Sequence, residues 1–132
     1  MGALRTIGWR GTHPPQLGPG PVPGYHEVMA DSRNATADLT VLPIGREGAS
    51  VGDVLVELRR HLEAQDEVRF RMHAMGTSLE GPVDRIFALA AELHAIPLGA
   101  GIPRAYTVLK VDQRTDKEQT LESKLESVED RL

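Results

Sequence analysis

The sequence contains no cysteine, and this absence excludes several kinds of site. Disulfide scaffolds, zinc–thiolate centres, thiol nucleophiles and dithiol redox motifs all need a sulfur that the chain does not provide. An excess of positive charge is also missing, because 15 Lys and Arg residues stand against 19 Asp and Glu residues, a formal net charge of −4. A net acidic chain without a basic run is a poor candidate for binding nucleic-acid phosphates.

Aromatic residues and long apolar runs are scarce as well. Aromatic residues make up 4% of the 132 residues, and they are Trp9, Tyr25, Phe70, Phe87 and Tyr106. No apolar stretch approaches the ~20 residues that a bilayer-spanning helix needs. The sequence therefore predicts no membrane segment.

Glycine and proline are concentrated in residues 1–36, which hold six of the 13 glycines and five of the nine prolines. The run from Gly18 to Gly24 suits neither a helix nor a central strand. We expect residues 1–36 to form an unstructured arm, because they offer too little apolar surface to offset the entropy of ordering. The arm lacks the continuous apolar segment of a secretory signal, which favours a cytoplasmic protein.

Regular patterns begin at Ala37, so we expect the folded domain to span residues 37–132. Apolar residues alternate in the segments that we predict to be strands, and they recur at helical spacing in the predicted helices. The predicted strands are residues 37–44, 67–74, 77–80 and 103–112, and the predicted helices are residues 51–64, 82–96 and 121–132.

The helix ends are predicted from capping signals. Ser50 with Asp53, and Thr115 with Glu118, resemble capping boxes before the first and last helices. Pro82 suits the first position of the middle helix, and Pro97 is expected to stop that helix. The apolar side of the middle helix is predicted to consist of Val83, Ile86, Phe87, Ala90 and Leu93.

The order of these elements, β-α-β-β-α-β plus a terminal helix, predicts an α+β ferredoxin-like sandwich. Two helices would cover one face of a four-stranded sheet and leave the other face open. Tyr106 and Val108 are out of phase with Leu109 and Val111 and are apolar, so we expect the open face to bury against a partner subunit. The alternative, that scattered exposed apolar residues need no partner, stays open.

Catalytic and metal-binding motifs are missing from the sequence. His61, His73 and His94 lie on three different predicted elements, without the spacing of a metal site. No serine lies in the turn that exposes a nucleophile. RNA-recognition domains share this order of elements, but they stack bases on aromatic side chains, which the first and third strands do not carry.

Two polar clusters remain as candidate sites. Residues 75–81, MGTSLEG, place Thr77, Ser78 and Glu80 just before a helix, where their oxygens could hold a ligand. An equally weighted alternative is that Glu80 caps that helix. The second cluster, in residues 110–116, alternates Lys110, Asp112 and Arg114, and we interpret it as an ion-paired strand end at a subunit interface.

Five short motifs in this order resemble the YkoF-like thiamine-binding proteins. They span residues 37–132 and leave residues 1–36 outside the resemblance. The motifs are Leu42–Gly45, Ser50–Val51, Met75–Gly81, Lys110–Asp116, and Glu122–Lys124 with Ser127–Val128.

The resemblance implies a homotetramer of dimers whose sheets pack together, in a family without an established catalytic activity. We therefore expect a non-catalytic protein that requires no cofactor. The resemblance also implies binding of thiamine or its hydroxymethylpyrimidine half, as a carrier, buffer or sensor. An aminopyrimidine offers an amine and ring nitrogens that hydroxyl and carboxylate groups can satisfy. The expected ligand-binding residues are Gly45 and Ser50 at the first strand–helix junction, Thr77, Ser78 and Glu80 beside them, and Met75 as an apolar wall.

Two other functions stay open at this point. The chain could be an enzyme acting on a small pyrimidine or anionic metabolite, with Glu80 as acid or base and Lys110 or Arg114 holding an anion. It could also be a structural or regulatory oligomer without a ligand. In each case we expect the protein to associate with itself through the open sheet face, and not with nucleic acid or membrane.

Overall fold

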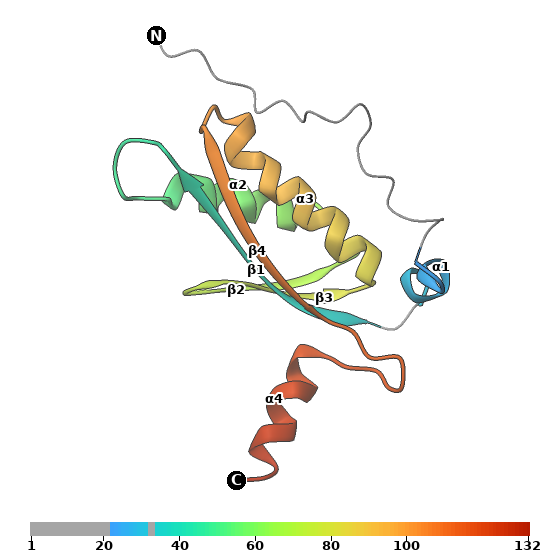
Figure 1. Cartoon of the computed structure of the whole chain (residues 1–132). Helices are drawn as coiled ribbons and strands as arrows, with labels where there is room; N and C mark the ends of the chain where they lie inside the picture. Colours follow the sequence, from blue (N-terminus) through green and yellow to red (C-terminus); the bar gives the residue numbers. More distant parts are fainter. Residues whose placement is uncertain (1–21, 32–33) are drawn as a thin grey trace.

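The computed structural model describes residues 22–31 and 34–132, and its elements follow the predicted order (Figure 1). The elements are α1 (Tyr25–Met29), β1 (Ala35–Ile44), α2 (Gly52–Glu63), β2 (Arg69–His73), β3 (Gly76–Gly81), α3 (Val83–Gly99), β4 (Arg104–Asp112) and α4 (Leu121–Glu129).

The four strands form one antiparallel sheet in the order β2-β3-β1-β4. Figure 1 shows α2 and α3 packed together over one face, while α4 extends from the other side of the sheet. This is the split arrangement expected of a ferredoxin-like α+β sandwich, so the predicted fold class is confirmed. Within the described ranges, no helix is both long and apolar enough to cross a membrane.

The core lies between the sheet and the helices α2 and α3. Phe70 and Met72 point inward from β2, and Leu109 and Val111 point inward from β4, as the alternation predicts. Fully or nearly fully buried apolar side chains make up the centre of this layer, and they are Ala35, Ala37, Leu39, Val41, Val54, Leu58, Leu62, Val68, Leu79, Val83, Ile86, Leu89, Ala90 and Leu93.

One predicted core residue of α3 is wrong. Phe87 is 48% exposed, and Leu89 is buried instead. Each helical residue turns the direction of its side chain by about 100°, so Phe87 points well away from Ile86. Leu89 and Ala90 lie three and four residues after Ile86 and share its inward side.

The end of α3 also differs from the prediction. Pro97 does not stop the helix, which continues to Gly99, and Pro82 is the residue before the helix rather than its first position. Pro97 lies in the last turn, where its missing N–H affects only the final hydrogen bonds, and its ring is fully buried. Its carbonyl accepts a hydrogen bond from Ile102 N at 3.0 Å, which connects the helix to the following loop.

Both predicted capping boxes are wrong. At α2, Asp53 does not cap the helix, because Arg46 binds both of its carboxylate oxygens at 2.9 and 2.8 Å. A bidentate guanidinium–carboxylate pair is stronger than a single bond to a backbone N–H. At α4, the capping box is formed by Thr120 and Ser123, whose hydroxyls accept from each other's backbone N–H at 3.0 and 2.9 Å.

The predicted arm is partly ordered where the structure describes it. Residues 25–29 form α1, and β1 begins at Ala35, two residues earlier than expected, with Ala35 and Thr36 both buried. Met29 packs against the core, and Gln113 Nε2 donates to Val28 O at 3.2 Å. These contacts bury part of residues 22–36, which the glycine- and proline-rich composition of this region did not indicate. The remainder of the predicted arm, residues 1–21 and 32–33, lies outside the described residues.

Candidate functional site

A cavity of about 310 Å³ lies between α2 and the hairpin that joins β2 to β3. It forms because β3 is shorter than β1. β3 pairs with residues 35–39 of β1, whereas β4 pairs with residues 36–44, so the last residues of β1 have a strand on one side only. The walls are mostly apolar and come from α2 (Val51, Leu55, Leu58, Leu62), from β1 (Leu39, Val41, Leu42), and from Met72, Met75 and Leu93.

Two threonine side chains bring polar groups to this cavity. Thr77 is 7% exposed, points to the helix side of the sheet, and its hydroxyl makes no hydrogen bond with the described residues. Thr40 Oγ1 donates to Met75 O at 3.1 Å and so fixes the tip of the hairpin. An apolar cavity with a few placed polar groups is the usual form of a small-molecule site.

His73 holds the hairpin at the mouth of the cavity. Its Nδ1 accepts a hydrogen bond from Met75 N at 3.3 Å, and its Nε2 lies 2.8 Å from Asp38 Oδ1. Since a backbone N–H can only donate, Nδ1 is the acceptor. The ring proton is therefore on Nε2, and the Nε2–H group donates a hydrogen bond to Asp38 Oδ1. The imidazole therefore connects the hairpin to β1.

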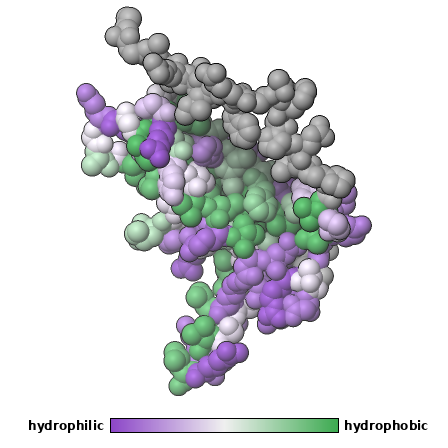
Figure 2. Space-filling model, viewed as in Figure 1, coloured by the Kyte–Doolittle hydropathy of each residue, from purple (hydrophilic) through white to green (hydrophobic). Residues whose placement is uncertain are grey.

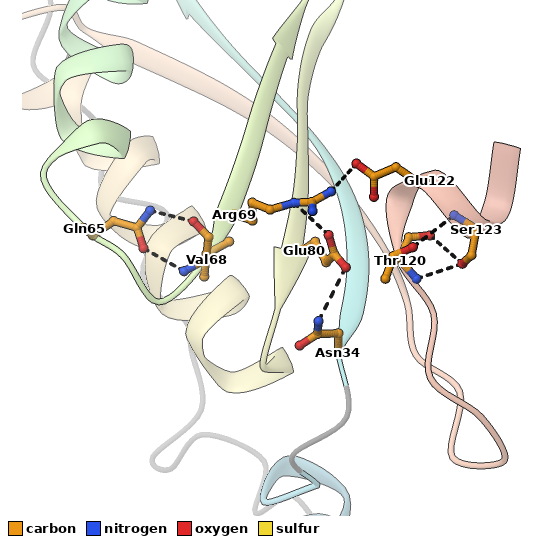
Figure 3. Close-up of polar contacts among 8 residues, drawn as sticks. All are labelled: Asn34, Gln65, Val68, Arg69, Glu80, Thr120, Glu122 and Ser123. Carbon is orange, nitrogen blue, oxygen red and sulfur yellow. Dashed lines mark hydrogen bonds and ion pairs between the residues drawn. The ribbon is translucent and has the colours of Figure 1, made fainter. Parts of the chain in front are cut away.

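Glu80 lies at the opposite end of β3, on the open face of the sheet. It is 4% exposed, Arg69 Nε lies 3.0 Å from its Oε2, and Asn34 Nδ2 donates to its Oε1 at 3.4 Å. Figure 3 shows Arg69 between Glu80 and Glu122, so that one guanidinium joins β2, β3 and α4. The buried carboxylate is thus held in an ion pair that connects three elements.

Glu80 is also far from the first strand–helix junction. It pairs with Thr36 in the sheet, eight residues before Ile44. At ~3.3 Å per residue, this places Glu80 roughly 26 Å along β1 from that junction. The predicted convergence of Glu80 with Gly45 and Ser50 is therefore wrong, because β3 runs antiparallel to β1. The alternative that Glu80 caps α3 is wrong too, since α3 has no side-chain cap.

The other predicted site residues fall into three places. Met75 and Thr77 line the cavity, and Ser50 directly precedes its wall residue Val51. Ser78 lies on the open face, in a groove of about 590 Å³ between the sheet and α4. Gly45 lines a separate hollow near Pro103, and a Cβ there would stand 2.7 Å from the ring of Pro103, with φ already at +91°. The backbone angle and the lack of space for a Cβ therefore explain why position 45 is a glycine.

Asp112 and Arg114 of the charged cluster at residues 110–116 form ion pairs within the chain. Asp112 pairs with Lys124 of α4, and Arg114 Nε donates to Asp116 Oδ1 at 2.7 Å. The hydrogen bonds from Arg114 lower the pKa of Asp116 to about 2. Arg114 is thus occupied, which removes the expected anion-binding role of that residue. Among the described residues, no three His, Asp or Glu side chains gather into a metal-binding group.

The sequence pattern of one family matches most of the chain. The match to the thiamine-binding protein family covers residues 37–129. The chain belongs to this family. The resemblance noted in the sequence is therefore confirmed at the level of the family.

Relatives within the family are similar over nearly their whole length. UPF0045 protein YqgV of Bacillus subtilis is 37% identical over 101 residues, which is 74% of this chain and 97% of the relative. UPF0045 protein MJ1052 of Methanocaldococcus jannaschii is 34% identical over 100 residues, covering 76% and 97%.

Solved structures share the fold. The crystal structure of the hypothetical protein MJ1052 superposes with a TM-score of 0.67 at 34% identity, covering 74% of this chain and 97% of that one. A putative thiamine biosynthesis/salvage protein from Thermotoga maritima gives a TM-score of 0.60 at 20% identity, covering 72% and 98%. The second likeness concerns the fold alone.

Several residues of the cavity were not among the predicted ones. Thr40, His73 and the α2 residues Val51 and Leu55 were assigned only to strands and a helix. Their positions around the cavity follow from the sheet register and from the length of β3. Neither of these can be predicted from a local sequence pattern. His73 offered one signal, because it is polar and lies two residues before the Met75–Gly81 motif.

Proposed function

We propose that this protein binds thiamine or its hydroxymethylpyrimidine half in the cavity between α2 and the β2–β3 hairpin. The observation that carries the proposal is the Thr77 hydroxyl, which faces an apolar cavity and has no partner among the described residues. A hydroxyl can donate and accept, which matches the amine and ring nitrogens of an aminopyrimidine.

The size of the cavity favours a small ligand. Its volume of about 310 Å³ is at the low end of the roughly 300–1,000 Å³ that small-molecule sites span. Leucine and methionine side chains provide two apolar walls against which a flat ring can lie, in place of aromatic stacking. Membership of the thiamine-binding protein family supports the same ligand class.

We propose binding without catalysis, in a carrier, buffer or sensor role. Thr77, Thr40 and the His73–Asp38 pair are the polar groups around the cavity, and they form a set that orients a ligand. Glu80, the acid or base of the enzymatic alternative, is ion-paired with Arg69 on the other face of the sheet.

Calorimetric titration with thiamine and with hydroxymethylpyrimidine tests the proposal. Leu55→Trp would fill the cavity and is expected to abolish binding, and Thr77→Val is expected to weaken binding about tenfold through loss of one hydrogen bond. Val56→Trp is the matched control, because Val56 is 49% exposed on the same helix and does not line the cavity. Absence of heat with either ligand at millimolar concentration, or equal affinity of the two tryptophan variants, would contradict the proposal.

The open face of the sheet favours a second property, self-association. Leu42 and Ile44 of β1 and Tyr106 and Val108 of β4 are between 38% and 50% exposed, and they are neighbours across the two strands. Exposed apolar patches of this kind mark interaction surfaces. We propose that two copies associate through this face, as the resemblance implies.

A further inference from the structure

The tip of the β2–β3 hairpin forms one wall of the cavity, and hydrogen bonds to its backbone hold it there. Ala74 and Met75 make the turn between the two strands, and both line the cavity. Thr40 Oγ1 donates to Met75 O at 3.1 Å, and Met75 N donates to His73 Nδ1 at 3.3 Å. Figure 2 shows hydrophobic residues at this tip, at the left of the view, next to hydrophilic ones. Of the two side chains that hold Met75, only the histidine changes its charge near neutral pH.

The contact between His73 and Met75 exists only while the imidazole ring is neutral. The neutral ring uses both of its nitrogens, because Nδ1 accepts from Met75 N while Nε2–H donates to Asp38 Oδ1 at 2.8 Å. A protonated imidazole carries a hydrogen on each nitrogen and has no acceptor left. Among the described residues that line the cavity, His73 is also the one titratable side chain.

The charged groups around the ring determine how the hairpin responds to protonation. Asp38 of β1 is the charged group in contact with the ring. Other charged side chains lie around the ring at longer range on the same face of the sheet, and they are Arg71 of β2, Lys110 of β4, and Glu122 and Lys124 of α4. The helices α2 and α3 bring only apolar side chains to the cavity. Protonation therefore converts the contact with Asp38 into an ion pair, which is stronger than the neutral hydrogen bond.

We propose that His73 positions the hairpin for ligand binding and that protonation of His73 lowers the affinity of the cavity. In the protonated state Nδ1–H faces Met75 N–H, and two donors cannot form a hydrogen bond with each other. Rotation of the ring would relieve this conflict but would break the ion pair with Asp38. The tip of the hairpin therefore moves, and Ala74 and Met75 leave their place in the cavity wall. This inference rests on the ligand binding proposed above and names the residue that regulates that site.

Calorimetric titration with hydroxymethylpyrimidine at about pH 8 and about pH 5.5 tests the proposal, because histidine changes its charge in this range. The affinity of the wild-type protein is expected to fall about five- to tenfold on acidification, as for the loss of one hydrogen bond. In His73→Gln, which does not titrate here, the fall should be smaller by that factor. Protonation of the ligand itself affects all proteins equally, so comparison between proteins at each pH isolates the effect of His73.

His61→Gln is the matched control, because it makes the same chemical change at a histidine outside the cavity. His61 lies on α2, and its Nε2 is 2.6 Å from Glu92 Oε2 of α3. This variant is expected to show the pH dependence of the wild type. An equal fall in affinity for wild type and His73→Gln would overturn the inference.

NMR spectra of the ligand-free protein test the hairpin contact without relying on ligand binding. The ¹⁵N shifts of the His73 ring are expected to place the proton on Nε2 at about pH 8. The amide resonance of Met75 should then shift on acidification with the same midpoint as the ring, and it should not do so in His73→Gln. A Met75 amide that does not respond when the ring is protonated would overturn the inference.

The two measurements also separate this inference from the proposed function. If the wild-type protein binds hydroxymethylpyrimidine equally well at both pH values, ligand binding stands and the role of His73 is wrong. If neither hydroxymethylpyrimidine nor thiamine binds while the Met75 amide follows the ring, the proposed function fails and control of binding by His73 fails with it. If His73→Gln binds no ligand at any pH, the wild-type affinities at the two pH values and the Met75 resonance decide.

Discussion

Gly76 lies where β3 begins, close to the backbone of β1. A Cβ at this position would stand 2.7 Å from Leu39 O and 2.9 Å from Thr40 Oγ1. The first atom belongs to the backbone of a central strand and cannot move without disturbing the sheet. Glycine is therefore required here by the space between the strands, and not by an unusual backbone angle.

We predict that Gly76→Ala destabilises the protein by about 1–3 kcal/mol, the usual range for overpacking. Chemical denaturation monitored by circular dichroism measures the change. Gly99→Ala is the matched control, because nothing lies within 4 Å of a Cβ at that position, and it is expected to cause no loss. Equal stability of the two variants would show that the hairpin can shift to admit a methyl group.

The side chains of residues 75–81 lie on both faces of the sheet, and only part of this arrangement can be predicted from the local sequence. Polar residues in a row suggest one binding surface, but side chains of a strand alternate between its two faces. Thr77 therefore points toward the helices, and Ser78 and Glu80 point to the open face. This separation was predictable from the period of two, whereas the burial of Glu80 against Arg69 was not, because the two residues are brought together by strand pairing.

At the scale of elements, the sequence predicted the strands and the buried sides of the helices better than the helix ends. Alternation placed Phe70, Met72, Leu109 and Val111 correctly, because burial of one sheet face imposes it. Capping depends instead on whether a side chain forms a stronger contact with another partner than with the backbone N–H groups at the helix start. Asp53 binds Arg46, a choice between two local contacts that spacing alone does not decide.

The attachment of α4 is expected to depend on pH through Glu122. The hydrogen bond from Arg69, with added attraction from the charges of Arg69 and Arg71, lowers the pKa of Glu122 below its ordinary value of 4.5. A carboxyl with a lowered pKa stabilises the attached state above its ordinary pKa, and this contribution is lost as the pH falls through the lowered value. The start of α4 should therefore loosen in acid, below pH 4.5.

A carbon-detected NMR titration of the Glu122 carboxyl measures this effect. The midpoint is expected below 4.5 in the wild-type protein and closer to 4.5 in Arg69→Gln. Arg131→Gln is a control that removes a cation of the same type outside this ion pair. A midpoint that is the same in wild type and Arg69→Gln would show that the pair does not persist in solution.

At the scale of the whole molecule, the cavity results from a difference in length between two paired strands. β1 continues past the last residue that β3 covers, and α2 closes the gap from one side. No single segment encodes this arrangement. The sequence therefore predicted the fold and two residues of the cavity, Met75 and Thr77, but not the place where the cavity lies.

The cavity and the patch around Val108 are centred on different faces of the sheet. Most of the cavity wall comes from α2 and from helix-facing side chains of the sheet, and the patch lies on the open face; Leu42 borders both, because it lines the cavity and lies opposite Tyr106. We predict that Val108→Asp makes the protein monomeric, because it places a carboxylate in the proposed interface. The same variant should bind thiamine or hydroxymethylpyrimidine with the wild-type affinity to within about twofold, because Val108 itself does not line the cavity.

Sedimentation velocity and calorimetric titration on the same sample check both halves of this prediction. Leu55→Trp is the reciprocal control and should lose the ligand while keeping the self-association of the wild type. A monomeric Val108→Asp variant that binds more than about tenfold more weakly would show that the second copy completes the cavity. In that case His73 is the residue through which the effect would pass, because it borders both the cavity and the groove on the open face.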